Sequence, residues 1–127
     1  VLVIAFEFGN LCFNSPASEQ RIIMVIASLS EFSSLDKFIT AALTFLETDE
    51  DLCDSWTELY KERVNLPASD EDIAFITERT HAMNLRVKIR FQPVKKAVNI
   101  LPHKWNQVTM CLETEHDYIF YSWVTTA

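Results

Sequence analysis

The chain has 127 residues, of which 49% are hydrophobic, and it carries a formal net charge of −7 and a single glycine, Gly9. This length and apolar content fit a single domain, whereas one glycine excludes the glycine-rich phosphate loops of dinucleotide, P-loop and kinase sites. The longest apolar run, residues 22–27, is far shorter than the roughly 20 residues of a membrane-spanning helix and follows no basic leader, so we expect neither a span nor a signal peptide.

The amino-terminal half predicts one strand followed by helices. Residues 1–8 are rich in β-branched and aromatic side chains, which favour a buried strand. Residues 22–29 are apolar nearly all round and follow Ser15 and Pro16, a helix cap and a first-turn proline, so we interpret them as a central buried helix. Three further helices are predicted after the capping patterns Ser33-x-x-Asp36, Thr48-x-x-Asp51 and Ser69-x-x-Asp72.

The carboxy-terminal part predicts an antiparallel meander. Strict alternation of apolar and basic residues over 85–91 is the clearest strand pattern, and residues 95–101 indicate a short extended edge. Residues 107–113 and 118–125 predict a hairpin. We therefore predict one α+β domain over the whole chain, residues 1–127, with an N-terminal strand, about four helices on one face of the sheet, and a C-terminal antiparallel meander of three to four strands.

Charge is distributed unevenly along the chain. Residues 1–78 hold 15 acidic and 4 basic side chains, whereas residues 79–127 hold 3 acidic and 7 basic ones. A basic surface within an acidic domain fits an acidic protein partner, a neighbouring subunit or the domain's own helices, while the net charge disfavours nucleic acid. Trp105 lies nearby, in a turn predicted between Pro102 and Asn106. The candidate binding residues are Arg86, Lys88, Arg90, Lys95 and Lys96.

No metal or cofactor site is predicted. The three histidines and three cysteines show no C-x-x-C or H-x3-H spacing, which zinc sites commonly use. The acidic run over residues 47–54 lacks the glycine and the ligand spacing of an EF-hand loop. We interpret its carboxylates as residues favoured at the start of a helix.

The cysteines indicate a cellular compartment. Cys12, Cys53 and Cys111 are odd in number and widely spaced. That pattern favours reduced thiols in the cytoplasm or nucleus over a disulfide framework. The chain begins at Val1 with a strand-like segment, so we expect it to be part of a longer intracellular protein.

One pattern in the sequence is compatible with a catalytic cysteine and histidine. Residues 9–15, Gly-Asn-Leu-Cys-Phe-Asn-Ser, place Cys12 ahead of a predicted helix, and His116 lies in the predicted late hairpin. This order of parts resembles papain-like and ovarian-tumour-type cysteine proteases, which pair a cysteine at a helix start with a late-strand histidine. The resemblance implies Cys12 as nucleophile, His116 as base and Asp117 or Asn10 as the orienting group. A leucine interrupts the family's Gly-Asn-Cys order, and the predicted helix starts after the cysteine.

Two functions follow from these patterns. The favoured one is a non-catalytic protein-interaction or assembly domain of a larger protein, since the architecture and the basic surface require no catalytic chemistry. The alternative is a cysteine hydrolase built on Cys12 and His116. Burial of Cys12 would favour the first function, and a sulfur beside an imidazole in an open groove would favour the second.

Overall fold

A computed structural model describes residues 3–11, 20–48, 61, 63–81 and 93–125, and every structural statement below concerns these residues. The secondary structure is dominated by strands. Its elements are β1 (Val3–Leu11), β2 (Gln20–Ser28), the 3₁₀ turn η1 (Leu29–Glu31), α1 (Leu35–Thr48), β3 (Leu66–Pro67), α3 (Asp70–His81), β4 (Val94–Asn99), β5 (Gln107–Thr114) and β6 (Asp117–Thr125).

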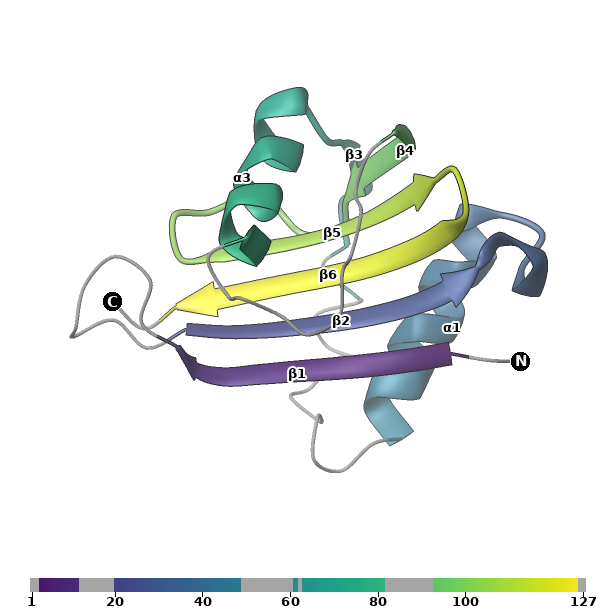
Figure 1. Cartoon of the computed structure of the whole chain (residues 1–127), viewed down its shortest axis with the longest axis horizontal. Coiled ribbons are helices and arrows are strands. Elements are labelled where there is room, and N and C mark those ends of the chain that lie inside the picture. The colour runs from purple at the N-terminus through teal and green to yellow at the C-terminus, as the bar shows by residue number, and fades with distance from the viewer. Residues whose placement is uncertain (1–2, 12–19, 49–60, 62, 82–92, 126–127) are drawn as a thin grey trace.

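The strands form one antiparallel sheet in the order β1-β2-β6-β5-β4-β3 (Figure 1). The longest pairing joins β2 to β6, from Gln20 opposite Thr125 at one end to Ser28 opposite Asp117 at the other. At the opposite edge from β1, the two-residue strand β3 follows Asn65, whose φ of 50° lies in the left-handed region that asparagine tolerates. The central strands therefore link amino-terminal and carboxy-terminal segments of the chain.

The two helices pack on opposite faces of this sheet (Figure 1). Successive side chains of a strand point to opposite faces, so a strand between two helices must be apolar on both. In β2, Ile23 and Val25 pack with α1, whereas Ile22 and Met24 pack with α3. The α1 layer also holds Phe38, Ile39, Ala42, Leu46, Cys111 and Phe120, and the α3 layer also holds Ile73, Ile76, Met110, Ile119, Tyr121 and Trp123.

The predicted fold class is wrong in its helices, although an α+β mix is present. The described residues hold two α-helices and not about four, and these cover both faces of the sheet and not one. Residues 22–29, predicted as a buried helix, lie in β2 and the start of η1. The physical reason is that apolarity on every side also fits an inner strand between two helices, and the β-branched Ile22, Ile23 and Val25 favour that strand.

Several local predictions are confirmed. Residues 1–8 largely coincide with β1, and the predicted hairpin coincides with β5 and β6. Residues 95–101, predicted as an extended edge, largely coincide with β4, but the two-residue β3 lies outside β4 at the edge of the sheet. The helix predicted at Ser33 is α1, but its cap is one residue later, since Ser34 Oγ accepts a hydrogen bond from Lys37 N at 3.3 Å. Thr48, predicted to cap the next helix, is instead the last residue of α1. The body of that predicted helix and the strand predicted over 85–91 lie outside the described residues.

Candidate functional site

The turn between β4 and β5 presents the most exposed large apolar side chain among the described residues. Trp105 is 73% exposed. Two reciprocal backbone hydrogen bonds close the turn, from Lys104 N to Gln107 O at 2.9 Å and from Gln107 N to Lys104 O at 3.2 Å. A third runs from Thr125 N in β6 to Asn106 O at 3.0 Å. We call residues 102–106 the Trp105 turn.

The start of α3 lies beside this turn and is tied to it by one carboxylate. Asp72 and Ser69 form the predicted capping box, in which Asp72 Oδ2 accepts from Ser69 N at 2.9 Å and Ser69 Oγ accepts from Asp72 N at 3.2 Å. The same Oδ2 accepts from Asn99 Nδ2 at 3.1 Å. Asp72 Oδ1 lies 2.7 Å from His103 Nδ1, in the Trp105 turn.

This arrangement favours the ionised form of Asp72. Burial raises the pKa of its carboxyl, but hydrogen bonds from the Ser69 backbone, the Asn99 side chain, the Ser69 side chain and His103 together hold that pKa below the usual 3.8. The side chain of His103 is 32% exposed, against 19% for Asp72. The pair therefore combines a fixed carboxylate with an imidazole that reaches the surface.

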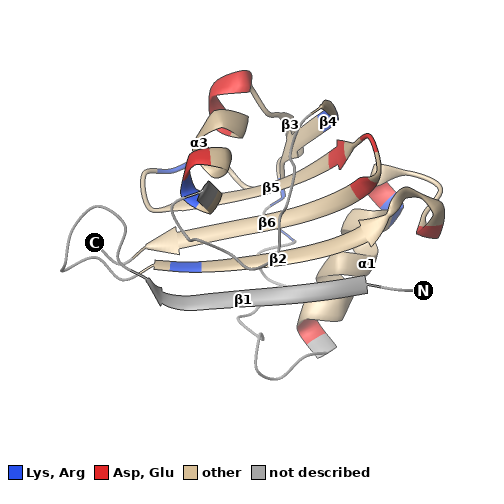
Figure 2. Ribbon diagram, in the orientation of Figure 1, with Lys and Arg blue, Asp and Glu red and all other residues tan. Residues whose placement is uncertain are grey.

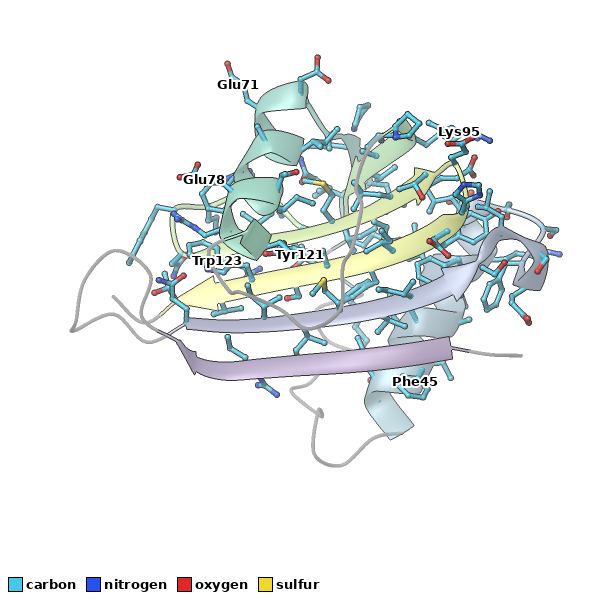
Figure 3. All side chains as sticks on the ribbon, viewed as in Figure 1. Phe45, Glu71, Glu78, Lys95, Tyr121 and Trp123 are labelled. Carbon is cyan, nitrogen blue, oxygen red and sulfur yellow. The ribbon has the colours of Figure 1, made fainter. Side chains whose placement is uncertain are left out.

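An aromatic stack continues from His103 under α3. Phe75 meets the His103 ring edge-on with centroids 5.4 Å apart, and meets Trp123 at 5.1 Å. Trp123 Nε1 donates to Gln20 Oε1 at 2.7 Å, and the Arg79 guanidinium lies 4.7 Å from the centre of the Phe75 ring. Figure 3 shows Trp123 on the side of the sheet that carries α3. These contacts pack α3 against the sheet beside the Trp105 turn.

The residues predicted for a cysteine hydrolase are only partly described. Cys12 lies outside the described residues, while His116 is on the β5–β6 turn with 81% of its side chain exposed, 3.9 Å from Glu115. Asp117 begins β6. Leu11, the last residue of β1, pairs with Gln20 at the end of the sheet opposite the β5–β6 turn. The Cys12–His116 pair stays a prediction.

The predicted basic surface is also only partly described. Arg86, Lys88 and Arg90 lie outside the described residues. Lys95 and Lys96 are exposed on β4, and Lys96 is opposite Glu113 of β5. Acidic residues gather near this end of the sheet, at the β5–β6 turn (Figure 2). Lys96 therefore lies across from an acidic residue of the same domain.

The Cys111 thiol is shielded from solvent in the folded domain. It is fully buried in β5, and burial raises the pKa of its thiol well above the usual 9.0. In the described part of the chain, no three His, Cys, Asp or Glu side chains gather in a way that could hold a metal ion. Among the helices that the structure describes, none has the length and apolarity needed to cross a membrane.

Sequence reasoning missed the contact between Asp72 and His103. The sequence predicts Asp72 as a helix-capping residue and, separately, a turn between Pro102 and Asn106 that contains His103. No local signal connects them, because the sheet brings α3 and the β4–β5 connection together. The available clue was only that an acidic capping residue and a histidine in a proline-bounded turn could form a hydrogen bond if the fold brought them together.

Comparison with known proteins adds no relative, since no family model, curated protein or solved structure matches the chain.

Proposed function

We propose that this chain is a non-catalytic protein-interaction domain and that the Trp105 turn is its principal contact with a partner. The observation that carries the proposal is the 73% exposure of Trp105 on a turn closed by backbone hydrogen bonds at both ends. Exposing a tryptophan to water is unfavourable, and tryptophan is enriched among the few residues that dominate interface energies.

The surroundings of Trp105 support a partner surface with an apolar pocket and an acidic rim. Val124 is 40% exposed on β6, and its neighbour Thr125 donates a backbone hydrogen bond to Asn106 O of the turn. Lys104 precedes Trp105 and is exposed. Charge at the rim of an interface acts mainly on encounter and specificity, so a carboxylate of the partner near Lys104 would orient the complex.

The experiment places a photo-cross-linking amino acid at position 105 of the full protein in its native cells. A second copy of the protein carries the cross-linker at Leu66, which is 56% exposed on β3 at an edge of the sheet. We expect a discrete cross-linked partner from position 105 and none from position 66. Adducts from position 66 alone would overturn the proposal.

Affinity then gives the energetic test. Truncating a central tryptophan of an interface typically costs about 2 kcal/mol or more, which is at least about thirtyfold in the dissociation constant. We expect Trp105→Ala to weaken binding of the cross-linked partner by this amount and to leave the melting temperature unchanged, because the side chain is exposed. Leu66→Ala is the matched control and should bind as the wild type does.

A further inference from the structure

We infer that the Asp72–His103 pair positions the Trp105 turn, so that the cap of α3 and the contact turn form one linked unit. The functional part of this inference rests on the proposed function, because it explains how the contact turn is kept ready for a partner. The link itself belongs to the free domain and can be measured there.

Two contacts attach the turn to α3. His103 Nδ1 lies 2.7 Å from Asp72 Oδ1, and the His103 ring meets the Phe75 ring edge-on at 5.4 Å. Asp72 and Phe75 belong to α3, and His103 stands two residues before Trp105. On the other side of Trp105, Asn106 O accepts from Thr125 N of β6. The turn that carries Trp105 is therefore held between α3 and β6.

The carboxylate is itself held in place by the rest of the fold. Ser69 N and Asn99 Nδ2 both donate to Asp72 Oδ2, which leaves Oδ1 directed at His103. Asn99 is only 6% exposed at the end of β4, so its buried side-chain amide restrains the position of the Asp72 carboxylate relative to the sheet. Hydrogen bonds to a charged acceptor are shorter and stronger than neutral ones, so an oriented carboxylate is well suited to restrain a loop.

Restraint of the turn has a consequence for binding. A partner that contacts an ordered loop does not lose free energy in ordering it, so preorganisation improves affinity without any new contact. Asp72 and His103 would thus influence the affinity for a partner by ordering the turn, without contacting the partner themselves. They are positioning residues for the contact made by Trp105.

Amide hydrogen exchange on the free full-length chain tests the link. The reporters are the Lys104 and Gln107 amides, which close the turn, and the Tyr121 amide in β6 serves as the reference for global unfolding. We expect Asp72→Asn to speed exchange of both reporters about tenfold or more relative to the reference, because a charged hydrogen bond is lost.

Two further variants separate the link from the helix cap. Ser69→Ala removes the Ser69 Oγ acceptor of the cap but leaves the Asp72 carboxylate beside His103, so the reporters should exchange as in the wild type. His103→Phe keeps a ring against Phe75 and removes the donor to Asp72, so the reporters should exchange faster. Reporter exchange that is unchanged in both Asp72→Asn and His103→Phe would overturn the inference.

Binding distinguishes failure of the link from failure of the proposed function. If both are right, His103→Phe weakens binding of the cross-linked partner, and Trp105→Ala weakens it further. If the reporters respond as expected but Trp105→Ala binds normally, the link stands and the proposed contact is wrong. If Trp105→Ala loses binding while the reporters do not respond, the contact stands and the positioning role is wrong.

Discussion

Tyr121 shows how the environment of a single side chain controls its chemistry. It is fully buried between β6 and α3, and burial raises the pKa of its phenol to about 12, although Thr80 and Arg79 act in the opposite direction. Tyr118, on the other face of the sheet, also has a raised pKa, because of burial and the nearby charge of Glu113. Both phenols therefore remain neutral in the folded domain well into the alkaline range.

The raised pKa of Tyr121 predicts a loss of stability at alkaline pH. The unfolded chain releases this proton near pH 10, whereas the folded domain holds it to about pH 12, so the free energy of unfolding must fall across that window. A shift of this size corresponds to about 2–3 kcal/mol. We expect Tyr121→Phe to lose that much less stability than the wild type between the two pH values, as measured by denaturant titration. Tyr118 is present in both proteins, so equal losses would show that Tyr121 ionises normally.

At the scale of elements, β2 and α1 show two different ways of burying apolar residues. Val25 in β2 has no exposed surface, and the strand is covered by a helix on each face. In α1, Phe38, Ile39 and Ala42 are buried, whereas Lys37 and Thr40 are exposed. A helix on the surface of a sheet needs one apolar face, but an inner strand needs two.

A pair of aspartate substitutions tests this difference. Val25→Asp places an unpaired charge inside the sheet, so we expect it to lower the free energy of unfolding by at least about 3 kcal/mol or to prevent folding. Lys37→Asp changes an exposed residue in the first turn of α1, where the helix dipole favours negative charge, and should lie within about 0.5 kcal/mol of the wild type. Circular dichroism melts of both variants provide the measurement. Comparable shifts in the two variants would contradict the assignment of β2 to the interior.

The whole molecule has two apolar layers that share one sheet. Alternate residues of β2, β5 and β6 contribute to each layer, and each layer is closed by its own helix. A layer cannot lose its packing without exposing strands that also support the other layer. The two layers should therefore unfold together, although α1 and α3 do not touch the same face of the sheet.

Truncations in the two layers test this cooperativity. Phe38→Ala in α1 and Ile76→Ala in α3 each remove a fully buried side chain, and we expect losses of about 3–5 and 2–5 kcal/mol respectively. In each variant, far-ultraviolet and near-ultraviolet circular dichroism should report one coincident transition. Separate transitions in either variant would mean that one helical layer melts on its own.

The sequence alone determined the elements whose signals are local. The capping box of Ser69 and Asp72 predicted the start of α3. Two strand-like runs joined by a short polar turn predicted the β5–β6 hairpin. Both signals depend on contacts between close neighbours in the chain. Only the tertiary structure decided that residues 22–28 form a strand, since burial on both faces removes the periodicity that separates strand from helix. It also decided that Asp72 meets His103, because that contact depends on how α3 packs on the sheet beside the turn between β4 and β5.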